Sequence, residues 1–364
     1  MGQSIVNIPF LLRGHLKDFK IKHLNLNLLF KQKHFHQNIR YFTRQSYLFG
    51  RLSNGAGASL YDFAKRHKPR MTNSTIIGDI EIYPWSISGI ETSISIHKDN
   101  LNVAFDMGFS HREAVRCPYV FISHGHIDHI AAIPQHAAKR DLYSMKPATY
   151  YMPGSLIDSV KKICDSFSDM HEHLESLTNI NLQPIELGES IQFAPNWTVE
   201  PFATKHRVES QGYILYHQRK HLKEEYKKLS SQEIGKRVRA GEQVHNVVRT
   251  PEIAYTGDTM FDIFHNPDNG DLLKVKLLIT ECTYIDNEVD FKGKTSVEKA
   301  RERGHTHLQE IVVNLDILQD VQSIMLVHFS DKYSSRFIQE TVMQSVPAEM
   351  RHKVFVSTLA KELL

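Results

Sequence analysis

Three histidines and one aspartate stand within six consecutive residues of this chain, at His124, His126, Asp128 and His129. They closely follow the apolar run 118–122, which has the length of a strand. His124 and His126 can point the same way, because alternate residues of an extended backbone share a face. Asp128 and His129 follow where the backbone turns. The chain has 22 histidines, so a His-rich surface loop is the alternative, but the H-x-H-x-D-H register favours metal ligands, with zinc, manganese or iron as the metal.

Three more residues of ligand type close apolar runs further along the chain. They are His206, Asp258 and His328. Each of them alone would suggest a surface residue or a satisfied core residue. Together with the first four they make seven ligands, the number that a bridged two-metal site uses. Three histidines would serve one ion, two histidines and an aspartate the other, and one aspartate would be shared. The pattern therefore predicts metal-assisted hydrolysis.

Short strands and helices that could position these ligands begin near Thr75. Their order does not decide between a doubly wound sheet and a sandwich of two sheets, so both stay open at this point. The predicted strands are 76–77, 80–83, 92–96, 101–106, 118–122, 148–152 and 197–203, and the predicted helices are 111–117, 130–142 (interrupted near its start by Pro134) and 156–177.

Composition narrows the class of protein. The cysteines Cys117, Cys164 and Cys282 form no C-x-x-C pair, which argues against a disulfide scaffold and against a thiolate zinc site. No apolar run approaches the ~20 residues that cross a bilayer, so we expect no membrane span. The net charge is only +3, and it says little about partners.

The N-terminal residues differ from the rest. Residues 1–61 hold nine Lys and Arg but a single acidic residue, Asp18. Acid-poor, basic segments of this kind are typical of organelle transit peptides. We expect a basic extension over 1–72 and a catalytic domain over 73–364. The mitochondrion is favoured over the plastid, because Ser and Thr are sparse near Met1. A basic arm that contacts nucleic acid is the alternative, and the basic cluster 65–70 leaves the cytosol or nucleus as further locations.

The order of the ligands resembles that of ribonuclease Z, the transfer-RNA 3′-processing endonuclease of the metallo-β-lactamase superfamily, in its short plant-like form. The resemblance runs from about Ile77 to the C-terminus. It implies an α/β fold, an αββα four-layer sandwich of the metallo-β-lactamase type. It also implies precursor transfer RNA as substrate, a homodimer, and two zinc ions per subunit, with manganese or magnesium as alternatives. The matching segments are 104–108, 121–124, 205–213, 255–259 and 326–330.

Two further segments resemble motifs specific to this family. Residues 278–284 are similar to its His-Glu-Ala-Thr segment, from which Thr280 and Cys282 depart, and residues 303–308 are similar to its Gly-His-Ser/Thr segment. The resemblance implies that Glu281 and His305 form a pair that delivers a proton to the leaving 3′ oxygen. An imidazolium held by a carboxylate suits that task.

Within the same scheme Asp128 is predicted to hold one ion and to take the proton of the attacking water. Without the resemblance to this family, Glu281 and His305 would be interpreted as an ordinary surface ion pair.

The stretch 217–239 departs from the wider family, which often carries a Gly/Pro-rich arm that grips the transfer-RNA elbow. Here it holds eight Lys and Arg and three Glu. A basic helix or loop can contact phosphates without reading sequence. A solvated charged face is the alternative. The candidate RNA contacts are Lys220, Lys223, Lys227 and Lys228.

These observations predict a zinc-dependent endoribonuclease that cleaves the 3′ trailer from precursor transfer RNA by two-metal hydroxide attack. Another hydrolase of the same fold, such as a cyclic-nucleotide phosphodiesterase or a thioesterase, is the first alternative, and we would expect it to lack the Glu281/His305 pair. A non-catalytic RNA-binding relative is the second. Such relatives lose metal ligands, whereas all seven are present here.

Overall fold

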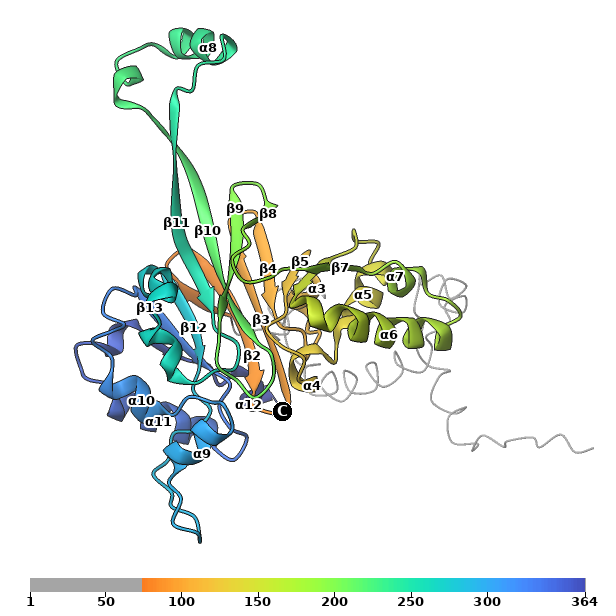
Figure 1. Ribbon diagram of the computed structural model, residues 1–364, viewed down its shortest axis with the longest axis vertical. Helices are drawn as coiled ribbons and strands as arrows, with labels where there is room; N and C mark the ends of the chain where they lie inside the picture. The colour runs from red at the N-terminus through yellow and green to blue at the C-terminus, as the bar shows by residue number, and fades with distance from the viewer. Residues whose placement is uncertain (1–73, 364) are drawn as a thin grey trace, which may run out of the picture. The chain divides into compact units, whose positions relative to one another are not determined.

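The computed structural model of the protein describes residues 74–363 (Figure 1). The predicted basic extension 1–72 lies outside the described residues, so its targeting role and the boundary at residue 73 stay predictions. Within residues 74–363, no helix combines the length and the apolar character needed to span a membrane.

Two seven-stranded sheets lie at the centre of the described chain. In each sheet four strands pair antiparallel and the remaining ones pair parallel. Parallel neighbours need crossover connections, which here contain the helices. The first sheet has the order β1 (Thr75–Ile77), β2 (Ile80–Ile87), β3 (Glu91–Lys98), β4 (Leu101–Phe105), β5 (Tyr119–Phe121), β6 (Thr149–Met152) and β7 (Asn181–Pro184). The second has the order β14 (Val354–Val356), β13 (Ser323–Val327), β12 (Leu277–Glu281), β11 (His245–Tyr255), β10 (Gln211–Leu222), β9 (Trp197–Ala203) and β8 (Ile191–Ala194).

Helices cover the outer face of each sheet. Those of the first sheet are α3 (Arg112–Val115), α4 (Ile127–Ile130), α5 (Ile133–Leu142), α6 (Gly154–Met170) and α7 (Glu175–Thr178). Those that follow the strands of the second sheet are the 3-10 helices η4 (Phe261–His265), η5 (Pro267–Lys274) and η6 (Arg351–Lys353), and α9 (Ser296–Glu302), α10 (Leu308–Val313) and α11 (Ser335–Ser345). The last helix, α12 (Leu359–Leu363), lies against β2 of the first sheet.

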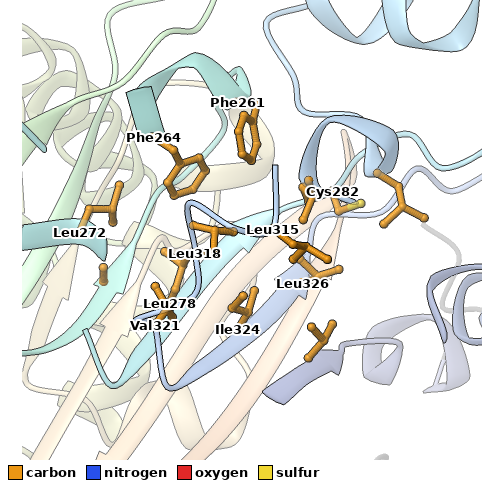
Figure 2. Packing of buried hydrophobic residues seen from close by; sticks show 14 of the residues in the cluster. Phe261, Phe264, Leu272, Leu278, Cys282, Leu315, Leu318, Val321, Ile324 and Leu326 are labelled. Atoms are coloured by element: carbon orange, nitrogen blue, oxygen red, sulfur yellow. The ribbon is translucent and has the colours of Figure 1, made fainter. Parts of the chain in front are cut away.

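Three buried hydrophobic layers separate these elements. In β12, Leu277 and Ile279 face the layer between the sheets, while Leu278 faces the layer under α10 and α11 (Figure 2). A third layer joins Val120 of β5 to Ile133 of α5. This alternation requires sheet-on-sheet packing with helices outside. The predicted αββα sandwich is therefore confirmed, and the doubly wound sheet is excluded.

Two predicted helices differ in their bounds. Pro134 does not interrupt a helix, because α4 ends at Ile130 and Pro134 lies in the first turn of α5. A proline is tolerated there, since the first turn lacks partners for its N–H groups anyway. The predicted helix 156–177 ends as α6 at Met170, since Glu172 and His173 adopt φ angles of 56° and 62° that break it.

A long hairpin, the arm (residues 217–250), extends β10 and β11 beyond the neighbouring strands (Figure 1). It carries η3 (Glu224–Tyr226) and α8 (Ser231–Arg239), which begins with a capping box at Ser230. The prediction of a helix or loop is thus wrong for residues 217–222, which are a strand. At the arm's root the buried carboxylate of Glu252 lies 2.7 Å from Lys276 Nζ and 3.6 Å from the Arg219 guanidinium.

Candidate active site

All seven predicted ligands lie together at the edge where both sheets end. His124 and His126 follow β5, Asp128 and His129 belong to α4, and His206 follows β9. Asp258 and His328 follow the parallel strands β11 and β13. Parallel strands present their carboxyl ends at the same edge, so residues far apart in the chain meet there.

Three imidazoles converge in a first group. His124 Nε2 lies 3.0 Å from His126 Nδ1, and His206 Nε2 lies 3.3 Å from the same atom. Ligand nitrogens around a tetrahedral zinc ion are ~3.3 Å apart, because the zinc–nitrogen distance is about 2.0–2.1 Å. A carboxylate oxygen of Asp258 lies 3.8 Å from His124 Nε2 and 4.0 Å from His206 Nε2.

A second group shares Asp258 with the first. Asp128 Oδ2 lies 3.3 Å from His129 Nε2 and 3.5 Å from His328 Nε2. Asp258 Oδ1 lies 3.3 Å from His328 Nε2, while its Oδ2 lies 3.5 Å from His129 Nε2. Asp258 therefore stands between the two groups, as a shared ligand must.

Hydrogen bonds hold two of the histidines in the tautomer that can bind a divalent metal ion. Ser123 Oγ gives its proton to Asp106, so it accepts from His124 Nδ1 at 2.9 Å, and the carbonyl oxygen of Gly304 accepts from His206 Nδ1 at 2.8 Å. A proton on Nδ1 leaves the lone pair of Nε2 free for a metal. His129 Nε2 is buried without a hydrogen-bond partner in the described chain, and its position among carboxylates suits a cation. The fold and these clusters are compatible with divalent metal binding.

Electrostatics separate the two groups. Burial, together with neighbouring imidazoles, lowers the pKa of His124 far below its usual value, and burial also lowers the pKa values of His126 and His206. These rings are neutral, the form that binds metal. Burial disfavours charge on His129 as well, but Asp258 and Asp106 outweigh it and raise the pKa of His129. The same carboxylates would attract a metal cation.

Sequence reasoning missed the role of Asp106. Its Oδ2 accepts from His129 Nδ1 at 2.7 Å and from the Tyr255 hydroxyl at 2.6 Å, and its Oδ1 accepts from the backbone N–H of Ser123 at 2.7 Å. It thus fixes the orientation of His129 and the start of the histidine-rich loop. Its position in the sequence could have indicated this role. Asp106 ends an apolar strand, as does Asp258, which was predicted to be a ligand.

Two glycines allow the close approaches on which the site depends. A Cβ on Gly108 would come within 1.7 Å of the Asp128 carbonyl oxygen. Gly304 has φ +74°, and a Cβ there would come within 2.9 Å of His206 Nδ1. Side chains at these positions would push α4 and His206 away from the cluster.

Glu281, which is buried, and His305, which is partly exposed, form a pair beside the cluster. His305 Nδ1 lies 3.1 Å from Glu281 Oε1 and 3.9 Å from Asp258 Oδ2. Thr283 Oγ1 donates to Glu281 Oε2 at 2.5 Å, and it therefore accepts from His328 Nδ1 at 3.0 Å. This hydroxyl, to which the sequence assigned no role, joins the pair to a predicted metal ligand.

The two departures from the family motif leave this pair intact. Residues of β12 alternate between faces. Glu281 and Thr283 face the cluster, whereas Cys282 is buried in the layer under α10 (Figure 2). Thr280 accepts a 3.3 Å hydrogen bond from Thr256. Neither side chain is one of the candidate ligands or part of the Glu281/His305 pair.

The four candidate RNA contacts do not join the cluster. Lys220 lies in β10, Lys223 and Lys227 flank η3, and Lys228 follows it. All four therefore lie on the arm (Figure 1).

The family model that matches this chain agrees with the observed fold. Residues 90–329 match the family model of the beta-lactamase superfamily domain. The crystal structure of human tRNase Z, short form, is 16% identical with a TM-score of 0.49, over 76% of this chain and 95% of that one.

Two curated relatives from Arabidopsis thaliana are more similar in sequence. tRNase Z TRZ1 is 37% identical over 283 residues, which cover 77% of this chain and 96% of that protein. The chloroplastic tRNase Z TRZ2 is 34% identical over 71% of this chain and 70% of its own length. The chain therefore belongs to the tRNase Z (ribonuclease Z) family of the β-lactamase superfamily.

The protonation of His305 can be measured directly. Burial opposes its charge, but Glu281 outweighs burial and raises the pKa of His305 to about 9. In protein stripped of metal by chelator, we expect its imidazole to titrate near that value by nuclear magnetic resonance. Glu281→Gln should move the titration to lower pH by about 1–3 units, since the stabilising charge is lost. Glu288→Gln, whose carboxylate faces Lys332 instead, should leave it unchanged. A wild-type value near 6.5 would contradict this account.

Proposed function

We propose that the protein is an endoribonuclease that removes the 3′ trailer from precursor transfer RNA. The observation that carries the proposal is the Glu281/His305 pair beside two groups of ligands that share Asp258. A hydrolytic metal centre alone suits many substrates, whereas a charged imidazole next to it suits an alkoxide leaving group. The relatives named tRNase Z supply the substrate class.

We assign the ligands of two divalent ions, zinc in the first instance and manganese or magnesium as alternatives. His124, His126 and His206 would hold one ion, Asp128, His129 and His328 the other, and Asp258 both. Such ions activate water as a nucleophile and neutralise charge on the phosphoryl oxygens.

The protein's own groups then move the protons. Asp128 would accept the proton of the attacking water. Burial opposes its charge, but His129 and His328 outweigh burial and hold its pKa well below the usual value, so the carboxylate is ionised and carries no proton of its own. His305 holds its Nδ1 proton toward Glu281, so its Nε2 proton goes to the 3′ oxygen as the phosphorus–oxygen bond breaks. The products are a 3′-hydroxyl on the transfer RNA and a 5′-phosphate on the trailer.

Trailer release tests this function. The full-length protein loaded with zinc or manganese should shorten a 3′-extended precursor transfer RNA, and chelator should stop it. His305→Ala should lower kcat by roughly 10²–10⁴-fold, the usual contribution of a general acid, while the metal content stays equal to that of the wild type. If the wild type releases no trailer but hydrolyses a small phosphodiester or thioester, another hydrolase of this fold is the better assignment.

The arm supplies a second expected result. Charge–charge interactions with phosphates hold RNA without reading its sequence. Lys227 is paired with Glu224, whereas Lys220, Lys223 and Lys228 have no carboxylate within 4.0 Å among residues 74–363. Lys220→Glu with Lys223→Glu should raise KM and lower the salt dependence of kcat/KM by about 1 for each lysine–phosphate pair that the substitutions remove.

Two controls accompany the arm variant. Lys227→Glu alone should act weakly, because its ammonium already has a partner. Lys146→Glu with Arg351→Glu makes the same charge change at exposed positions off the arm and off α6. Equal kinetics for the arm variant and this control at low salt would show that the arm is only a solvated charged face.

We propose further that the protein is a homodimer that pairs through α6. Ile163, Phe167 and Met170 are 42%, 48% and 73% exposed along one side of this helix, and apolar stripes of this kind mark association surfaces. Light scattering should give twice the subunit mass, and Phe167→Asp with Met170→Asp should give the monomer. Val313→Asp, on the exposed side of α10, should leave the mass unchanged. A monomeric wild type at micromolar concentration would refute the proposal.

Residues 1–72 are proposed as a mitochondrial transit peptide ahead of a nuclease domain at 73–364. The basic, acid-poor composition supports this, and the relative TRZ2 is named chloroplastic, so the plastid is the main alternative. Residues 1–72 fused to a fluorescent protein should carry it into mitochondria, and the reporter alone is the control. Fluorescence confined to plastids, cytosol or nucleus would replace this assignment.

A further inference from the structure

An arginine without a carboxylate partner stands at the rim of the active site. α9 ends at Glu302, and Arg303 and Gly304 form the turn that leads into His305. Arg303 is exposed, and no carboxylate oxygen of residues 74–363 lies within 4.0 Å of its guanidinium.

Tyr284 holds this guanidinium in place. Arg303 Nη1 donates to the Tyr284 hydroxyl at 2.6 Å, and the guanidinium carbon lies 5.9 Å from the ring centre. The ring itself is 8% exposed and lies 6.4 Å from the His305 ring. Its backbone is tied to the following helix, since its carbonyl accepts from Leu308 N at 2.8 Å. Arg303 is thus oriented beside His305.

The neighbouring cations are already paired. Lys332 lies 5.8 Å from the same Tyr284 ring, but its Nζ is 2.5 Å from Asp286 and 3.0 Å from Glu288. Arg301, two residues before Arg303, is 2.7 Å from a carboxylate oxygen of Glu310. Because Arg303 has no such carboxylate partner, its guanidinium N–H groups can donate to an external anion.

We propose that Arg303 is a substrate-positioning residue that binds a phosphate of the RNA strand on the leaving-group side of the cut. This rests on the proposed endonuclease function. The leaving 3′ oxygen must meet His305, so the next phosphate on that side comes to the same rim as Arg303 and Tyr284. A guanidinium can pair with two phosphate oxygens at once. Arg303 forms and breaks no bond; it fixes the strand so that the 3′ oxygen reaches the His305 proton.

The test uses full-length protein and an acceptor-stem minihelix with a 3′ trailer, which lacks the transfer-RNA elbow. Arg303→Ala should raise KM by roughly ten- to hundredfold, the range for removal of a charge-assisted hydrogen bond. It should also lower the salt slope of kcat/KM by about 0.7–0.9. Arg303→Lys should recover the slope but only part of the KM, because an ammonium cannot pair with two oxygens in the same way.

Two variants separate binding from folding. Tyr284→Phe keeps the ring and removes the hydroxyl that orients Arg303, so its KM should lie between those of wild type and Arg303→Ala. Arg301→Ala removes a cation from the same helix end, but a paired one, and should leave both KM and the salt slope unchanged.

Equilibrium binding of the minihelix to chelator-treated protein gives a readout independent of turnover. Arg303→Ala should weaken it by a factor similar to the rise in KM. If the wild type cleaves while Arg303→Ala keeps the wild-type KM, Kd and salt slope, Arg303 only caps the turn and the inference is overturned. If the wild type does not cleave at all, the proposed function fails. The binding comparison still decides the role of Arg303: a weaker Kd supports it, and an unchanged Kd ends it.

Discussion

Three buried carboxylates, Asp106, Asp128 and Asp258, each lie within 3.5 Å of a ring nitrogen of His129, and they are the constraint on which the rest of this structure depends. Burying like charges is costly unless hydrogen bonds and cations compensate. His129 lies between all three, and the hydroxyl of Tyr255 and backbone N–H groups such as that of Gly89 satisfy the remaining oxygens. The same arrangement is a strong attraction for divalent ions. Both the stability of the fold and the proposed chemistry therefore require positive charge next to these carboxylates.

The site exists only where the two sheets meet. The backbone of Ser123, after β5 of the first sheet, accepts from Gln211 N at the start of β10 in the second. His124 forms an isolated bridge with Ser210, and Ser88 forms one with Ser330. Each proposed ion has ligands from both sheets, so neither half of the sandwich could assemble the centre alone. This explains why positive φ angles, such as 57° at Asp106 and 61° at His328, occur at the strand ends: the packed sheets hold them there.

The proposed substrate contacts lie apart from the proposed metal centre. The arm is exposed and basic, and it is anchored to the sandwich by the buried Glu252 at its root. Contacts there would add affinity without disturbing the buried carboxylates. The rim around Tyr284 has the opposite character, since its cations are ordered by aromatic and carboxylate neighbours. A strand held at both places would be positioned at the phosphate to be cut by contacts that read no sequence.

The sequence by itself identified the family and the seven candidate ligands that the structure brings together, because a histidine-rich loop and acids at strand ends are local patterns with few alternatives. It also predicted the pair of Glu281 and His305 from two short motifs, and the structure places their side chains 3.1 Å apart. It could not show that Asp106 orients His129, that Thr283 joins Glu281 to His328, or that residues 217–222 form a strand. Those depend on which segments become neighbours when the sheets pack. His206 and Gly304, which form a hydrogen bond, are 98 residues apart in the chain. A contact of this kind produces no periodic pattern in the sequence, so only the tertiary structure could show it.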